Sequence, residues 1–438
     1  MDKDDFYLIG EKGIRKLNSG KAEDLIEEDI PKFTKKQISL RSHGLAVTDK
    51  EGNLMKLLKK QYAQHFYPLS IVDYAKVSYN YARFGNEIPI LSIDSHDTIT
   101  CDFSCQDCLS GAGRNIPLKS DNYNFDLPLN FYLNILREIS EYSSKRGFDH
   151  VRFEQSGEGN PDLYPHRAEL IKNAKKKFGM ESVYVTTGSK MNEDITNALI
   201  ENGAFLRVSF PGIDPRSYEL YSHQSKYQFE DSLKKLEKIV NQREKEKSNL
   251  LIGVRAALRP EHESFYFHFA QQIKDLGVDV LQIVKILVPE GQNLDSSPLS
   301  KPSKNQLEKV NELSDNEFCI NLPNVLDSLY YGRVIQDRSN FPERCYSCVV
   351  QPVLAGRDLY VCTKSEVMYS HKYQLGRFNG NKEEINQFLS KENIIKTTQG
   401  APKTCEACCS MFDNVLMHEI YQLTKKIDKN LEFYELVK

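Results

Sequence analysis

The sequence predicts an α/β fold, with an incomplete barrel of six βα units over residues 89–315. An N-terminal extension, 1–88, precedes it, and a small Cys-rich α+β domain, 316–438, follows it. Strand-like and amphipathic helical patterns alternate through the middle of the chain, and the alternation stops near residue 315. Seven of the ten cysteines lie beyond that point.

Residues 1–88 are polar and are predicted to be mostly helical, with candidate helices over 54–66 and 70–84. A helical cap packed against the main domain is favoured over a peptide-binding module. The length of the extension suits either one.

The central alternation demands a parallel sheet, and six units are enough for an incomplete barrel. Sites in such barrels lie beyond the C-terminal ends of the strands. The expected strands cover 90–94 continuing to 98–103, 150–155, 182–187, 205–210, 251–258 and 278–287, and the expected helices cover 131–142, 167–178, 195–203, 229–245 and 265–277.

Three cysteines follow the first of these strands at the spacing CxxxCxxC, namely Cys101, Cys105 and Cys108. Thiolates gathered in one loop can hold three irons of a [4Fe–4S] cluster and leave the fourth iron open. A structural zinc knuckle, a disulfide and coincidence are the alternatives. Zinc prefers CxxC pairs with a fourth ligand close by, so the cluster is favoured.

Charge and hydropathy exclude several classes of protein. The net charge is −3, with 58 basic and 61 acidic residues. An overall electrostatic attraction to nucleic acid or to an anionic membrane is therefore not expected. No stretch approaches the roughly 18 apolar residues of a membrane span, and the first residues lack the apolar core of a signal peptide. We therefore expect a cytoplasmic protein, in which clustered cysteines indicate metal or redox chemistry.

Taken together, residues 90–415 resemble a radical S-adenosylmethionine (radical SAM) enzyme with a C-terminal SPASM or twitch auxiliary-cluster domain. The CxxxCxxC triplet is the strongest element of this resemblance. Ser156-Gly157-Glu158-Gly159 is similar to the family's GGEP motif, and the segments 183–191 and 206–212 are similar to its turns after the third and fourth strands.

The resemblance implies that S-adenosylmethionine chelates the open iron of a [4Fe–4S] cluster held by the triplet. Backbone groups of Ser156 and Gly157 and the carboxylate of Glu158 would hold its amino end, Ser209 its ribose and Arg255 its carboxylate. Each of these residues also has a purely structural interpretation, as part of a strand-to-helix loop or of a strand.

Two positions depart from the family pattern. Asp107 stands where an aromatic residue usually stacks on the adenine, and Gly159 stands where the family has Pro. The implied activity is reductive cleavage of S-adenosylmethionine to a 5′-deoxyadenosyl radical, which removes a hydrogen atom from an unactivated carbon. An electron donor such as flavodoxin or ferredoxin is implied as a partner.

The C-terminal cysteines Cys345, Cys362, Cys405 and Cys408 resemble the twitch arrangement for one auxiliary [4Fe–4S] cluster. With Cys348, however, Cys345 and Cys362 also resemble a three-ligand cluster. A zinc site of Cys345, Cys348, Cys405 and Cys408 stays open as well, because paired CxxC knuckles are what zinc prefers.

An auxiliary cluster offers an exit for an electron, which favours net oxidation of the substrate, either dehydrogenation or cross-linking. The favoured substrate is a ribosomally made peptide. The alternatives are dehydrogenation or epimerisation of a small polar molecule, such as an amino sugar or cyclitol, and a non-catalytic iron–sulfur or zinc protein that binds partners. A nucleic-acid-modifying enzyme is disfavoured by the mild acidity.

Overall fold

The computed structural model describes most of the central part of the chain and separate stretches at its two ends. Both backbone and side chains are described, apart from a few side chains at the ends of elements, for 89–105, 108, 127–149, 151–258, 265–285, 301–315, 317–321, 350–361 and 373–398. The backbone alone is described for five strands between residues 6 and 57 and for one strand at 432–437.

A ten-stranded sheet forms the main body, and seven of its strands are parallel and lie in chain order from β6 to β12. These strands are β6 (Ser92–His96), β7 (Arg152–Gln155), β8 (Glu181–Thr186), β9 (Gly203–Phe210), β10 (Leu251–Leu258), β11 (Val280–Lys285) and β12 (Cys319–Asn321). Because parallel strands need crossover connections, helices separate most of them.

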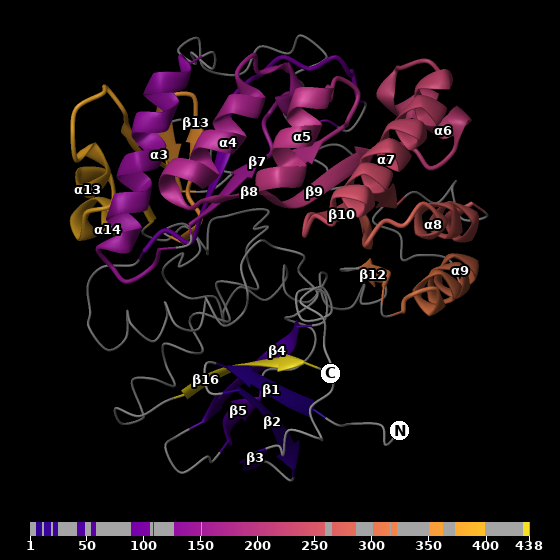
Figure 1. Cartoon of the computed structure of the whole chain (residues 1–438), viewed down its shortest axis with the longest axis horizontal. Coiled ribbons are helices and arrows are strands. Elements are labelled where there is room, and N and C mark those ends of the chain that lie inside the picture. The colour runs from indigo at the N-terminus through magenta and orange to yellow at the C-terminus, as the bar shows by residue number, and fades with distance from the viewer. Residues whose placement is uncertain are drawn as a thin grey trace.

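The helices cover one face of this sheet, as Figure 1 shows for α3, α4, α5 and α7. Right-handed crossovers between strands in sequential order all pass on the same side, so neighbouring helices such as α3 and α4 contact each other. The helices are α3 (Leu129–Ser144), α4 (Arg167–Phe178), α5 (Glu193–Asn202), α6 (Pro215–Ser222), α7 (Tyr227–Glu246), α8 (Tyr266–Asp275) and α9 (Lys301–Glu312), with a short 3-10 helix η4 (Pro161–Leu163) before α4.

Local sequence sets several helix ends. Asn192 caps α5 by accepting a hydrogen bond from the Ile195 backbone N–H, and Asp214 forms a capping box with Ser217 at the start of α6. Helix α4 ends at Gly179, whose φ of 68° lies in the left-handed region that glycine tolerates.

The predicted mixed α/β fold with a mostly parallel sheet is confirmed, and each helix expected between residues 131 and 277 overlaps an observed one. Helices α6 and α9 and strand β12 were not expected. The strand predicted over 98–103 is wrong, because the chain leaves the sheet after His96. Its carbonyl groups bond a neighbouring loop instead, with Thr98 O accepting from Gly159 N and Thr100 O from Asn160 N.

Three C-terminal strands extend the sheet beyond β6. The first pairs in parallel with β6, and the second pairs antiparallel with the first and with the third. Strand β13 (Val353–Ala355) pairs in parallel with β6 and turns at Gly356, φ 57°, into β14 (Asp358–Tyr360), which pairs with β15 (Gln374–Arg377). Helices α13 (Glu384–Phe388) and α14 (Lys391–Thr398) follow.

Residues 350–361 and 373–398 pack with the parallel strands, and the predicted Cys-rich domain over 316–438 stays a prediction. Leu354 and Leu359 share one hydrophobic core with Ile93 of β6 and Leu136 of α3. The expected hairpin is present, but its burial against β6 makes it part of the main body.

A six-stranded antiparallel sheet joins the two ends of the chain, in the order β3-β2-β1-β16-β4-β5. Its strands are β1 (Phe6–Gly10), β2 (Gly13–Asn18), β3 (Lys21–Asp24), β4 (Ser42–Thr48), β5 (Leu54–Leu57) and β16 (Glu432–Val437). The helical prediction is wrong for the five strands between residues 6 and 57. Strands β1 and β4 pair with a strand that lies between 384 and 430 positions further along the chain, and a local sequence pattern cannot reveal such pairing. The candidate helix over 70–84 lies outside the described residues.

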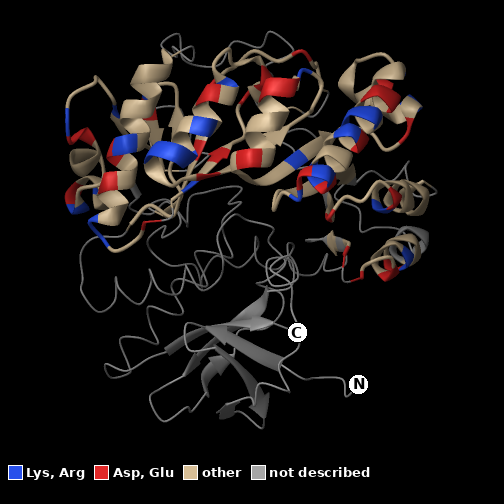
Figure 2. Cartoon of the chain, in the orientation of Figure 1, with Lys and Arg blue, Asp and Glu red and all other residues tan. Residues whose placement is uncertain are grey.

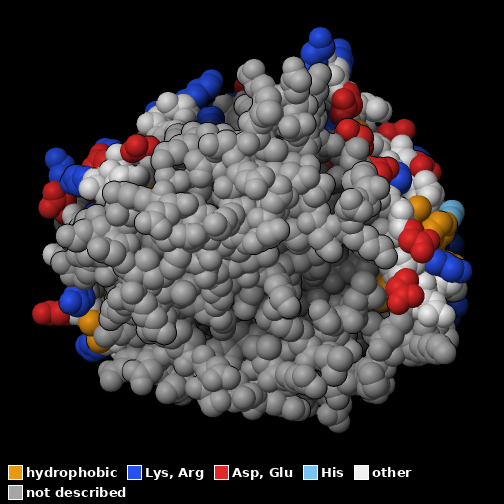
Figure 3. Space-filling view, turned by 90° about the horizontal axis from the view of Figure 1, so that it is seen from below, with side chains coloured by type: hydrophobic (Ala, Val, Ile, Leu, Met, Phe, Trp, Pro, Cys, Tyr) orange, Lys and Arg blue, Asp and Glu red, His pale blue; other side chains and the backbone are white. Residues whose placement is uncertain are grey.

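Charges of both signs are interspersed on the outer faces of the helices, as the nearly balanced composition leads one to expect (Figure 2). The same mixture borders the molecule when it is seen from below (Figure 3). No helix among the described residues is both long and apolar enough to span a membrane.

Candidate functional site

The face of the sheet opposite the helices is polar near the C-terminal ends of its strands. On β9, Leu206 and Val208 point into the helix-covered core, so Arg207 and Ser209 point to the other face. The same alternation puts Asp94 and His96 of β6, Glu154 of β7, Arg255 of β10 and Gln282 of β11 on that face. Charged side chains on a mostly buried sheet face indicate a site rather than a core.

Cys101 and Cys105 lie in the loop that follows β6, and both pack against the hydrophobic core formed by strands β8 to β12 and their helices. Phe103, between them, is buried in that core and contacts the Tyr218 ring edge-on at 6.1 Å. Ser104 N donates to Ser222 O, 3.2 Å away at the end of α6. The apolar side of the loop is therefore held at the sheet edge by Phe103 and by the hydrogen bond of Ser104.

The side chain of Asp102 attaches the same loop on its polar side. Its Oδ1 accepts a hydrogen bond from Asn160 Nδ2 at 2.8 Å, and its Oδ2 accepts one from Ser189 Oγ at 2.7 Å. Asn160 follows β7 and Ser189 follows β8, so three consecutive strand ends meet at one carboxylate.

Gly159 allows the loop after β7 to lie very close to the cysteine loop after β6. A Cβ at this position would collide with the carbonyl group of Thr100 and with the carbonyl carbon of Ile99. Only glycine leaves room for the backbone of the cysteine loop there. Gly159, which stands where the resembled family has Pro, is therefore the residue at which the backbones of the two loops come into close contact.

A buried ion pair fixes the start of the loop. Asp97 pairs with Arg167 at the beginning of α4, and both side chains are almost completely buried. Arg167 also donates to the Pro161 carbonyl oxygen at 3.0 Å and to Gln155 Oε1 at 2.7 Å. The guanidinium therefore ties the cysteine loop to the segment that follows β7.

Acidic side chains and one histidine gather beneath these loops. His96 Nε2 lies 3.3 Å from Asp94 Oδ2, and His96 Nδ1 lies 3.5 Å from Glu158 Oε1. Ser156 Oγ donates to Asp94 Oδ1 at 2.7 Å. Ser156 and Glu158 thus lie against side chains of β6, and Gly157 has a φ of 68°.

Glu154 is a carboxyl group of this face with a strongly raised pKa. Burial raises the pKa of Glu154 to about 7, and the nearby Asp94 carboxylate raises it further, while Arg207 and His96 oppose the rise. Gln351 Nε2 donates to its Oε2 at 3.2 Å. A buried carboxyl that titrates near neutrality is able to exchange a proton with a bound molecule.

Ser209 and Arg255 are register partners on adjacent parallel strands, and alternation puts them on the same face. Their predicted contacts with ribose and carboxylate stay predictions. Of the segments that contain predicted site residues, the structure brings the cysteine loop and the Ser156–Gly159 loop into contact. The cysteine loop also contacts the end of α6, where no site residue was predicted.

The three cysteines of the triplet form no disulfide bonds. Burial raises the pKa of Cys101 to about 11, with the negative charges of Asp102, Cys108 and Asp162 adding to the effect, so a metal would have to displace its proton. Among the described residues, no three Cys, His, Asp or Glu side chains are placed to hold a single metal ion. In a cubane each thiolate binds a different iron, so three soft sulfur donors of one loop fit a cluster better than one zinc ion.

The predicted ligands of the auxiliary cluster lie outside the described residues, as does Asp107; the predicted ligands are Cys345, Cys348, Cys362, Cys405 and Cys408. The choice between one auxiliary cluster, a three-ligand cluster and zinc therefore stays a prediction.

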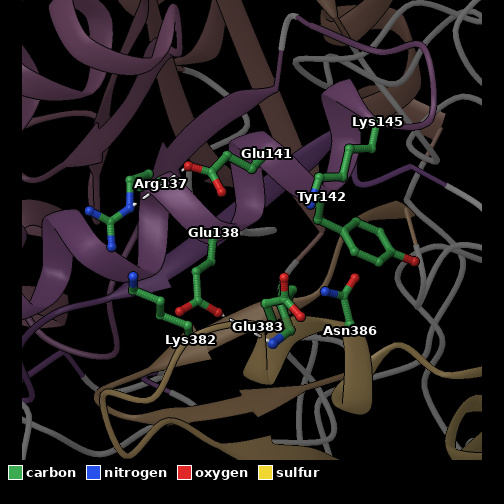
Figure 4. Close-up of a pocket in the computed structure, with 9 residues that line it drawn as sticks. Arg137, Glu138, Glu141, Tyr142, Lys145, Lys382, Glu383 and Asn386 are labelled. Atoms are coloured by element: carbon green, nitrogen blue, oxygen red, sulfur yellow. Dashed lines mark hydrogen bonds and ion pairs between the residues drawn. The ribbon is translucent and has the colours of Figure 1, made fainter.

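A pocket of about 320 Å³ lies elsewhere, between α3 and α13 (Figure 4). It is lined by Arg137, Glu138 and Glu141 from the C-terminal half of α3 and by Lys145, which directly follows that helix. A crossover helix runs against the strand direction, so this half lies near the N-terminal ends of the strands, away from the cysteine loop. The mixed charges of the pocket suggest no particular ligand.

Several residues of the site were not predicted from the sequence, namely Asp94, His96, Asp97, Asp102, Glu154, Asn160, Arg167 and Ser189. One signal was available: the polar run Ser95, His96, Asp97 continues directly from a buried strand. The others depend on contacts between loops that are distant in sequence.

Neither a scan against protein-family models nor a search of curated proteins finds a match. Solved structures do match. Streptococcus suis SuiB bound to S-adenosylmethionine has a TM-score of 0.50 at 9% identity, covering 74% of this chain and 72% of that chain. SuiB bound to precursor peptide SuiA has a TM-score of 0.52 at 11% identity, with the same coverage.

A further structure of SuiB covers more of both chains, 85% of this one and 94% of that one, at a TM-score of 0.51 and 11% identity. At such low identity the likeness shows a common fold. SuiB, which shares this fold, has been solved with S-adenosylmethionine bound.

Proposed function

We propose that this chain is a radical SAM enzyme that acts on a ribosomally made peptide. The observation that carries the proposal is the position of the cysteine loop. Cys101 and Cys105 lie in a loop at the C-terminal edge of a parallel sheet. Thr98 and Thr100 of the same loop accept hydrogen bonds from Gly159 and Asn160, which directly follow Glu158. Sites of parallel α/β sheets form at this edge.

Cys101, Cys105 and Cys108 would hold a [4Fe–4S] cluster, which when bound supplies the electron for reductive cleavage of S-adenosylmethionine. Ser209 and Arg255 offer a hydroxyl and a positive charge on the same sheet face, and Glu158 offers a negative charge from the loop after β7. A zwitterionic, ribose-containing cofactor is complementary to such a set.

Glu154 and Arg207 lie deeper on the same face than Ser156 and Ser209, two residues earlier on each strand. In the proposed enzyme these side chains face the substrate, and Glu154 accepts or holds a proton released as the substrate is oxidised. The hydrophobic packing around Phe103 excludes water from the base of the cysteine loop.

The common fold with SuiB, which has been solved with a precursor peptide, supports a peptide as the substrate. The terminal sheet supports it too, because its outer strands β3 and β5 each have only one partner among the described strands. Extended peptides bind by adding a strand to such edges. Net oxidation through an auxiliary cluster, held by cysteines of the segment 345–408, is part of the proposal.

The test is anaerobic reconstitution with iron and sulfide, followed by reduction in the presence of S-adenosylmethionine. We expect electron paramagnetic resonance (EPR) of a reduced [4Fe–4S] cluster and formation of 5′-deoxyadenosine. A variant with Cys101, Cys105 and Cys108 changed to Ala should lose both, whereas Cys319→Ala, in β12, should keep both. Wild-type protein that binds iron but never forms 5′-deoxyadenosine would contradict the proposed activity.

A further inference from the structure

We propose that Asp102 is a positioning residue whose hydrogen bonds to Asn160 and Ser189 hold the cysteine loop in its ligand-binding conformation before any cluster is present. The proposal rests on the proposed function, in which Cys101 and Cys105 are ligands. It assigns a role to a side chain that directly follows the first cysteine and that the sequence did not single out.

The contacts of Asp102 come from three different segments. Asn160 Nδ2 and Ser189 Oγ each donate to a different carboxylate oxygen, at 2.8 and 2.7 Å. The backbone oxygen of Asp102 accepts from Gln224 Nε2 at 2.7 Å. Three hydrogen bonds therefore fix both the backbone and the side chain of one residue, and Cys101 is its immediate neighbour.

The orientation of Asn160 is determined by its other partners. Asn160 is 1% exposed, and its Oδ1 accepts from Thr186 Oγ1 at 3.1 Å and from Asp162 N at 3.2 Å. The amide group must then turn its Nδ2 donor toward Asp102 and Ser189. A carboxylate at position 102 is the matching acceptor, because both of its oxygens accept.

The physical consequence is preorganisation. A loop that is ordered only on ligand binding subtracts its ordering entropy from the affinity, whereas a loop already held in place does not. Phe103 holds this loop on its apolar side, and Asp102 holds it on its polar side. Cys101 and Cys105, which flank these two residues, are then fixed in the iron-free protein.

The test measures the alkylation of Cys101 and Cys105 by iodoacetamide in iron-free full-length protein, with each site followed by mass spectrometry. Asn160→Asp keeps the acceptor that Thr186 and Asp162 use but turns an oxygen toward the Asp102 carboxylate. We expect alkylation at both cysteines to become about tenfold faster or more, since the rate follows the population of the open loop.

Reversing the two groups should restore the contact. In the double variant Asp102→Asn with Asn160→Asp, an amide again faces a carboxylate, and we expect rates within about threefold of the wild type. Asp102→Asn alone keeps one acceptor and gains a donor for Ser189 Oγ, so it should also stay within about threefold. Asn202→Asp, which alters a buried amide donor to Ala198 O at 3.0 Å in α5, is the matched control and should leave both rates unchanged.

Unchanged alkylation in Asn160→Asp, or a double variant as reactive as Asn160→Asp, would overturn the proposal. The EPR signal after reconstitution provides a second readout: we expect less cluster in Asn160→Asp and recovery in the double variant. Because alkylation is measured without iron, its result stands even where the loaded protein fails to cleave S-adenosylmethionine. Failure of the positioning role and failure of the proposed function are thus distinguishable.

Discussion

Glu154 makes the stability of this protein depend on pH in a direction opposite to that of most carboxyl groups. Its pKa rises from the ordinary 4.5 to about 7, first because the side chain is buried and then because Asp94 is near. Folding therefore favours the protonated form. Between pH 4.5 and pH 7 the folded chain binds more protons at this site than the unfolded chain, so the free energy of unfolding falls as the pH rises through this window.

The magnitude follows from the same pKa values. A difference of about 2.5 pH units, at 1.36 kcal/mol each, corresponds to roughly 3 kcal/mol. This stability is fully present below pH 4.5 and is lost above pH 7. Glu154→Gln has nearly the shape of the protonated acid and cannot ionise. At pH 5 the variant and the wild type should have similar free energies of unfolding. At pH 8 the variant should be more stable by up to about 3 kcal/mol.

The assay is urea unfolding at pH 5, 6, 7 and 8, followed by circular dichroism and by tyrosine fluorescence so that coincidence of the two transitions can be checked. Glu201→Gln, at an exposed position of α5, is the matched control and should show no such trend. A Glu154→Gln variant that is less stable than the wild type at pH 8, or a difference that does not vary with pH, would refute the reasoning.

Two further predictions concern the loops around the cysteines. Arg167→Met should lower the free energy of unfolding by roughly 3–5 kcal/mol in the same urea assay, because it leaves Asp97 charged and buried, and Arg167→Met combined with Asp97→Asn should recover part of the loss. Gly159→Ala should displace the cysteine loop, since the added methyl group collides with the Thr100 carbonyl, and should reduce the iron bound after reconstitution by at least half. Gly147→Ala, whose methyl group meets nothing within 4 Å, should retain its iron, and equal iron loss in both variants would contradict the assigned contact.

The sequence by itself determined the alternation of strands and helices between residues 90 and 315. Helix α4 falls on the predicted residues 167–178, because its apolar positions recur at helical spacing and Gly179 ends it. The position of the triplet after β6 was also predictable, since a strand end is a local feature. The roles proposed for Glu158, Ser209 and Arg255 come from the resemblance to a known family.

Only the tertiary structure decided which strands meet and which side chains surround the cysteine loop. The terminal sheet depends on pairing between strands at 6–10 and 42–48 and the strand at 432–437, and the hairpin at 353–360 pairs with β6. Asp102, Asn160 and Ser189 lie on three separate loops, and Glu154 is perturbed by neighbours from β6 and β9. Periodicity encodes the burial of each element, whereas hydrogen bonds and charges between distant segments exist only once the folded chain has brought those segments together.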